Sequence, residues 1–119
     1  DEAVALDVTP CADDAESKLT SVRFGKGAAI KVKDQSVLCS QRIIDLLTRL
    51  AREQGIPWQY EVLAAGGTDT SSIQMAGSGC AAGCISIPLK YTHTPVETLD
   101  LKDVRACADL LRAYLECGE

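Results

Sequence analysis

The chain has 119 residues, of which 46% are hydrophobic and 24% are charged, and its formal net charge is −5 at pH 7. A chain of this length is typical of one globular domain that buries roughly two-thirds of its unfolded surface. The acidic balance, with no cluster of Lys or Arg, argues against nucleic acid and anionic membranes as partners. We find no apolar run near the roughly 18 residues of a membrane span and no signal-peptide pattern. The six cysteines lie in apolar patterns, which favours reduced thiols and a cytoplasmic protein.

The chain opens with an alternating pattern over residues 3–8, in which Val4, Leu6 and Val8 share one face. This period of two predicts a buried strand with a single carboxylate, Asp7, near its carboxyl end. Residues 9–27 are rich in turn-forming residues and are predicted to form a loop. Because a strand at a raw terminus is an unusual start for a domain, we expect residues 1–119 to be one domain cut from a longer polypeptide.

A second strand and a helix are predicted next. Residues 29–33 alternate again, which indicates a strand with one solvent-exposed face. Residues 41–54 carry apolar side chains at helical spacing and predict an amphipathic helix. Ser40 is its expected N-cap, and Gly55 is its expected stop signal. The predicted buried stripe of this helix is Ile43, Leu46, Leu47, Leu50 and Ala51.

Two further strands are predicted over residues 58–64 and 84–89, separated by a Gly-Gly turn and a short helix over residues 70–76. Thr68 or Asp69 is suited to cap that short helix.

A last helix is predicted over residues 101–116, with Asp100 as its N-cap and Asp103 completing an approximate capping box. Gly118 is expected to end it. Its predicted buried stripe is Val104, Cys107, Ala108, Leu111 and Tyr114 or Leu115. Strands that alternate with helices predict an α/β fold, layered α/β/α around a mostly parallel or mixed sheet.

The single histidine, His93, lies between the fourth predicted strand and the last helix. A lone histidine at such a position can be a metal ligand or a proton carrier, but histidine is also a common surface or hydrogen-bonded residue. Glu97, four residues later, can orient the histidine or its loop, or it can be a solvated charge.

Asp7 and the turn Gly66-Gly67-Thr68-Asp69 are the other candidate site residues. Asp7 follows a strand, where open α/β sheets place their ligands, although an aspartate that caps a loop looks the same in sequence. The two glycines let backbone approach a ligand, or they simply form a turn before a helix cap. Cys80 and Cys84 lack the spacing of a metal-binding pair.

Four stretches together resemble one family. They are ALDVT at 5–9, GAAIKVKD at 27–34, GGTDT at 66–70 and ISIPLKYTHTPVE at 85–97. In this order they are similar to the C-terminal part of the catalytic domain of M42 family metallo-aminopeptidases, the glutamyl, deblocking and tetrahedral aminopeptidases. The resemblance covers nearly the whole chain, and it implies a zinc-peptidase-like catalytic domain.

The resemblance implies a peptide substrate and two divalent metal ions, zinc or cobalt, in the full-length enzyme. Asp7 matches an aspartate that ligates one metal ion, and His93 matches a histidine that ligates the other. Gly66, Gly67, Thr68 and Asp69 match the substrate-binding wall of the site. Two close metal ions can polarise a scissile carbonyl and lower the pKa of the attacking water toward ~7. The family also implies a homo-oligomer for the full-length protein.

The resemblance implies that the remaining family ligands and the general-base glutamate lie upstream of residue 1, so no catalytic residue is expected within this chain. One protein ligand per ion cannot hold zinc tightly, because a catalytic zinc site normally has three. We therefore expect residues 1–119 alone to bind metal weakly and to be inactive. The alternative is a non-catalytic α/β interaction or assembly module that retains the scaffold. A glycosidase would need a distinguishable pair of carboxylates, and the sequence offers none.

Overall fold

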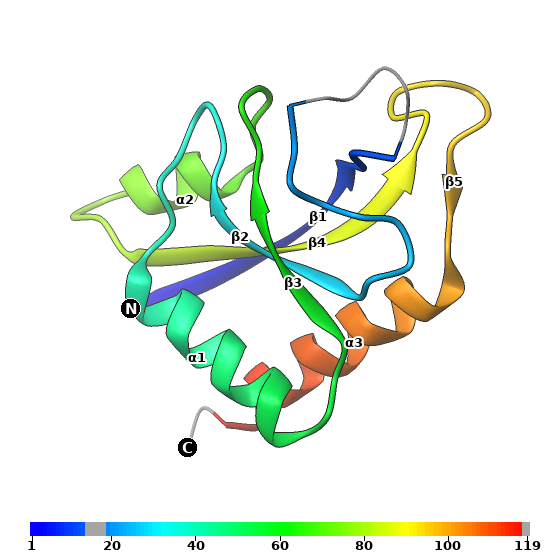
Figure 1. Ribbon diagram of the computed structural model, residues 1–119. Coiled ribbons are helices and arrows are strands. Elements are labelled where there is room, and N and C mark those ends of the chain that lie inside the picture. Colours follow the sequence, from blue (N-terminus) through cyan, green and yellow to red (C-terminus); the bar gives the residue numbers. More distant parts are fainter. Residues whose placement is uncertain (14–18, 118–119) are drawn as a thin grey trace.

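The computed structural model of the protein describes residues 1–13 and 19–117 (Figure 1). Strands and helices alternate along the chain, as the hydrophobic periodicity predicts. The elements are β1 (Glu2–Pro10), β2 (Ala28–Lys33), α1 (Gln41–Glu53), β3 (Trp58–Val62), α2 (Thr70–Met75), β4 (Ala81–Lys90), β5 (Thr98–Leu99) and α3 (Leu101–Glu116). None of the described helices is long and apolar enough to cross a membrane.

The strands form one mixed sheet in the order β1-β4-β2-β3, with the short β5 paired to β4. β1 runs parallel to β4 and β2 runs parallel to β3, whereas β2 and β4 are antiparallel. α1 provides the crossover between the parallel strands β2 and β3. The predicted layered α/β fold with a mixed sheet is confirmed, and β5 is an element that the sequence analysis did not predict.

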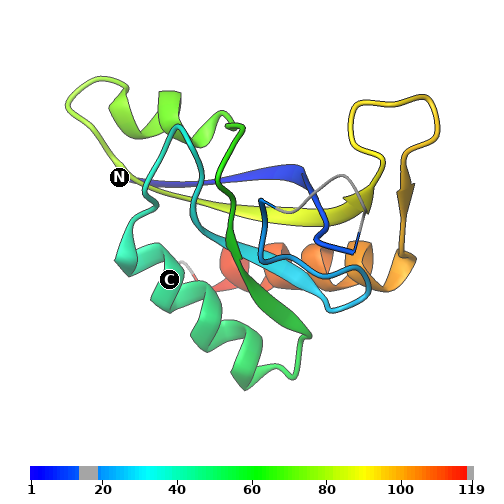
Figure 2. The same ribbon diagram turned by 45° about the horizontal axis from the view of Figure 1, so that its top comes forward.

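Helices α1 and α3 lie together on one side of the sheet, and α2 lies on the other side (Figure 2). The main core fills the space between the sheet and these two helices, where Ile30 and Ile85 meet Ile43, Leu47 and Leu110. A Cβ on Gly83 of β4 would collide with Ile43 Cγ2, so glycine lets α1 pack closely onto the sheet.

The predicted stripe of α1 is largely confirmed. Ile43, Leu47, Leu50 and Ala51 are buried, and Leu46 is partly buried. Ser40 is the residue at the N-cap position, but its side chain makes no capping hydrogen bond. Gly55 has φ +66°, the left-handed conformation that glycine adopts readily after a helix.

The predicted stripe of α3 is partly wrong. Cys107 is buried, but so are Ala106, Leu110 and Ala113, whereas Ala108 is exposed and Leu115 is 69% exposed. The helix is rich in Ala and Leu all round, so periodicity left its rotation ambiguous by about one residue. The predicted end at Gly118 lies outside the described residues.

Asp103 explains the rotation of α3, and its predicted role in a capping box is wrong. Its carboxylate is fully buried and accepts hydrogen bonds of 2.8 Å from the backbone N–H groups of both Gly25 and Gly27. Asp100 alone caps the helix, accepting a hydrogen bond from Lys102 N. Asp103 therefore ties α3 to the loop that leads into β2.

Two strand predictions are also corrected. Val4 packs against the core, but Leu6 and Val8 are 50% and 37% exposed. β1 lies at an edge of the sheet, so the described chain covers only part of its apolar face. Lys31, predicted to face solvent from the second strand, is only 1% exposed, because β2 lies between β4 and β3 and both of its faces are covered.

Candidate functional site

The face of the sheet that α1 and α3 leave uncovered is polar. Alternation along β1 and β2 turns Val4 and Ile30 toward the helices and turns Asp7, Thr9 and Lys31 toward the other face. Ser86 of β4, which pairs with Asp7, is buried on the same side. The sequence therefore builds one apolar face for the main core, and a second face where these polar groups lie beside a small apolar cluster of Cys11, Val22 and Ala29.

A cavity of about 330 Å³ opens on this polar face. Its walls come from the end of β1, the segment after β3 and the loop after β4. The lining residues are Asp7, Val8, Pro10, Leu19, Lys31, Leu63, Ala65, Gly66, Gly67, Thr68, Thr92 and His93. Asp7 and His93, the two predicted metal ligands, thus face one cavity although 85 residues separate them in the sequence.

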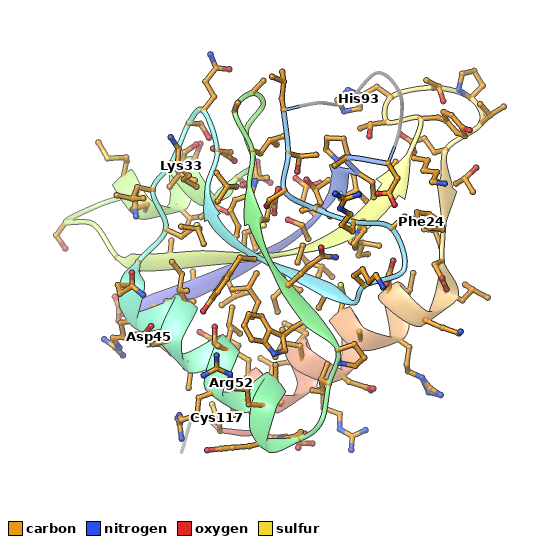
Figure 3. The ribbon with its side chains drawn as sticks, viewed as in Figure 1. Phe24, Lys33, Asp45, Arg52, His93 and Cys117 are labelled. Carbon is orange, nitrogen blue, oxygen red and sulfur yellow. The ribbon has the colours of Figure 1, made fainter. Side chains whose placement is uncertain are left out.

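The loop that carries His93 is strained and is held by its own side chains. Tyr91 and His93 have φ of 59° and 63°, a left-handed conformation that non-glycine residues rarely adopt. Glu97 Oε1 accepts a hydrogen bond of 2.6 Å from His93 N, and Thr94 Oγ1 donates one of 2.6 Å to Tyr91 O. Glu97 thus supports the loop through the histidine's backbone. Figure 3 shows the ring of His93 reaching inward from this loop.

Asp7 is partly buried, and its Oδ1 accepts a hydrogen bond of 2.7 Å from Val8 N. Asp7 and His93 offer a carboxylate and an imidazole, both of which are suitable zinc ligands. Within residues 1–13 and 19–117, however, no three His, Cys, Asp or Glu side chains are grouped closely enough to hold a metal ion. The donors present fit a divalent metal in kind but not in number.

The Gly-Gly turn lines the cavity, and the local backbone geometry and packing also favour glycine at both positions. Gly66 has φ +85°, and a Cβ on Gly67 would lie 2.7 Å from Ser36 Oγ. Thr68 Oγ1 accepts a hydrogen bond of 3.3 Å from the N–H of Thr70, the first residue of α2, although Asp69 holds the N-cap position. Asp69 is exposed, makes no side-chain capping bond and lies outside the lining of the cavity.

The floor of the cavity rests on a buried charge cluster of Lys31, Asp34 and Glu61. Lys31 Nζ lies 2.6 Å from Asp34 Oδ2 and 3.5 Å from Glu61 Oε2. Thr9 Oγ1 donates a hydrogen bond of 2.6 Å to Glu61 Oε2. Asp34 Oδ1 also accepts hydrogen bonds from the N–H groups of residues 36 and 37 and from the hydroxyl of residue 36. Three charged groups are therefore held together at almost complete burial.

The pKa values of this cluster follow from burial and pairing. Desolvation raises the pKa of Glu61, and the attraction of Lys31 offsets this only in part. For Lys31, desolvation favours the neutral form, but the charge of Glu61 and the hydrogen bond to Asp34 outweigh it and raise the pKa. Desolvation also opposes the charge on Asp34, yet the hydrogen bonds from Lys31 and Ser36 hold its pKa below the usual value.

Sequence reasoning missed Lys31, Thr92 and the apolar wall of the cavity. A lysine in an alternating strand looks solvent-exposed, and its acidic partner three residues later was the available signal. Thr92 Oγ1 is buried and has no hydrogen-bond partner in the described part of the chain. Nothing in the sequence separates apolar residues that line a cavity from those of a core. Cys39 and Cys107 agree with the prediction of small buried thiols, since burial raises the pKa of each to about 12.

A mixed α/β sheet that presents a carboxylate and an imidazole to one cavity is an arrangement suited to a hydrolytic or ligand-binding protein. The family model of the M42 glutamyl aminopeptidases matches residues 1–110. The chain belongs to this family.

Known proteins agree with this membership. A putative aminopeptidase of Acetivibrio thermocellus is 45% identical over 111 residues, which are 93% of this chain and 34% of that protein. The aminopeptidase APDkam598 of the archaeon Desulfurococcus kamchatkensis superposes with a TM-score of 0.90 at 35% identity, over 98% of this chain and 34% of that one. The TET1 peptidase of Pyrococcus horikoshii, which can assemble into a tetrahedron or a large octahedral shell, gives a TM-score of 0.77 at 32% identity, over 94% and 32% of the two chains. The chain spans about one third of the length of the curated relatives it matches.

Proposed function

We propose that residues 1–119 are the C-terminal segment of the catalytic domain of a metal-dependent aminopeptidase, which hydrolyses N-terminal residues from peptides. Membership of the family supports the peptidase activity. One observation supports the proposed metal site. Asp7, from the end of β1, and His93, from the loop after β4, line the same cavity. A carboxylate and an imidazole converging there are suited to divalent metal binding.

Asp7 and His93 would each donate to a different one of two metal ions. Bound metal would polarise the scissile carbonyl and activate water. The rest of the metal ligands and the general base would come from outside these 119 residues, which agrees with the absence of a three-ligand cluster among residues 1–13 and 19–117. Alone, the segment would bind metal weakly and would not hydrolyse peptides.

The chain's own residues position this chemistry. Glu97 holds the strained backbone of His93 and so fixes where the imidazole enters the cavity. The glycines at 66 and 67 carry no side chain into the wall, which leaves room for a peptide backbone. We extend to the whole protein the homo-oligomeric assembly of the TET1 peptidase and a cytoplasmic location.

Two measurements test this function. Substituting His93→Ala or Asp7→Ala in the whole enzyme should lower kcat/KM at least about 100-fold and reduce the bound metal, because each removes a direct ligand. Ser78→Ala, an exposed change outside the cavity, is the control and should leave both unchanged. Calorimetric titration of zinc into residues 1–119 should give a Kd above about 1 µM. A tighter site that disappears in His93→Ala would contradict the proposal of an incomplete site.

The same lack of a three-ligand cluster favours a second candidate, a non-catalytic α/β interaction or assembly module. The coding sequence upstream of Asp1 discriminates between the two. A start codon directly before residue 1 favours the module, and an upstream stretch encoding a histidine, an aspartate and a Glu-Glu pair favours the peptidase.

A further inference from the structure

The cavity that contains Asp7 and His93 has one wall that the metal chemistry does not use. This wall is apolar and consists of Val8, Pro10, Leu19, Leu63 and Ala65. We propose that it receives the side chain of the substrate's first residue and selects an uncharged aliphatic side chain, with Leu19 at the rim setting this preference. The inference rests on the proposed aminopeptidase function.

Backbone contacts hold the apolar wall in place. Ala64 N donates a hydrogen bond of 2.8 Å to Leu19 O, and Thr20 forms an antiparallel bridge with Leu63. These contacts fix Leu19 beside the segment after β3 while its side chain stays 57% exposed. An aliphatic group that enters the cavity would remove this apolar surface from water together with its own.

The charges on the wall disfavour the other substrate classes. The charged or titratable side chains on the described wall are Asp7, Lys31 and His93. Lys31 already lies 2.6 Å from Asp34 Oδ2 and 3.5 Å from Glu61 Oε2. Using Lys31 to bind an acidic substrate would draw its charge away from two buried carboxylates. The proposed metal site engages Asp7, so the described wall offers neither a spare cation for a Glu side chain nor a spare anion for a Lys side chain.

The test compares Leu, Glu and Lys p-nitroanilides as substrates of the whole metal-loaded enzyme. We expect kcat/KM for Leu to exceed the values for Glu and Lys at least about tenfold, because a charged side chain would be desolvated without a partner. A preference for Glu or Lys would overturn the inference and leave the aminopeptidase function standing. Hydrolysis of none of the three would overturn the function and the inference together.

The variant Leu19→Lys places a cation at the rim without touching the core. It should raise the ratio of kcat/KM for Glu over Leu by roughly twofold to fivefold, the effect of one exposed charge. Leu38→Lys is the matched control, since Leu38 is also exposed but lies outside the cavity, and its ratio should not change. An equal shift in both variants would show a general charge effect and would overturn the role of Leu19.

Discussion

Replacing Lys31 by methionine removes the only cation from the buried charge cluster while keeping nearly the same side-chain volume. Lys31 is 1% exposed, so Asp34 and Glu61 would be left as buried carboxylates without their common partner. Removing one member of a buried ion pair typically costs 3–5 kcal/mol. Asp34 keeps three hydrogen bonds from residues 36 and 37, which places the expected loss at the lower end, about 3 kcal/mol.

Urea unfolding of residues 1–119 measures this loss of stability, and the fluorescence of their single tryptophan, Trp58, follows the transition. With a slope of about 1–3 kcal/mol per molar, a loss of 3 kcal/mol lowers the midpoint by at least about 1 M. Lys33→Met is the matched control, because Lys33 is exposed two residues further along the same strand (Figure 3), and it should change stability by less than about 0.5 kcal/mol.

A second substitution distinguishes two possible causes of the destabilisation in Lys31→Met, the unpaired buried charge and the lost packing. Adding Glu61→Gln to Lys31→Met removes one uncompensated carboxylate and should recover about 1 kcal/mol or more of the loss. If Lys31→Met were no more destabilising than Lys33→Met, the cluster would not hold the floor of the cavity as we argue. If Glu61→Gln recovered nothing, packing and not charge would explain the loss.

Two further predictions concern other buried carboxylates. Asp34→Asn should destabilise the fold by about 3 kcal/mol at pH 7. The pKa of Asp34 is lowered in the folded state. The contribution of its carboxylate to the stability of the fold is therefore complete above the unfolded pKa near 3.8 and is lost as the pH falls through the folded pKa. The difference in the free energy of unfolding between Asp34→Asn and the unmodified protein, measured by urea titration, should therefore become smaller below pH 3.8. A difference that does not change with pH would contradict this. Asp103→Ala should cost about 3 kcal/mol, because it leaves the buried N–H of Gly27 without a partner and also removes the hydrogen bond to the N–H of Gly25. Asp109→Ala on the exposed side of α3 should cost under about 1 kcal/mol in the same assay. Equal losses in these two variants would refute the anchoring role of Asp103.

Most of the fold was predictable because alternation and helical spacing are local signals. The residues that the sequence misassigned depend on contacts made at long range. Lys31 is buried in a cluster with Glu61 of the neighbouring strand β3, and Asp103 is buried because a loop 76 residues away donates to it. Asp34, three residues after Lys31, is the one local sign of the buried cluster, and nothing near Asp103 in the sequence marks its burial. The exposure of Leu6 likewise follows from the place of β1 at the sheet edge.

The candidate site was predictable only in its polar residues. Asp7 and His93 are identified by residue type and by resemblance, and the two face one cavity in the structure. Their roles as metal ligands stay a prediction. The apolar wall around Leu19 could not be predicted, since a leucine in a loop carries no sign of whether it lines a cavity.

The buried cluster links the stability of the fold to the shape of the site. A sheet with an apolar core on both faces would place apolar side chains at positions such as Thr9, Lys31 and Glu61, and it would be easier to stabilise. Here Thr9 and Lys31 both contact Glu61 on the face opposite α1 and α3, and Lys31 itself lines the cavity. Because Lys31 and Glu61 compensate one another's buried charge, this cluster resists deformation of the strands that carry it. We infer that the polar face keeps β1 and the segment after β3 at a fixed separation, so that Asp7 and the apolar wall meet a substrate in one constant geometry.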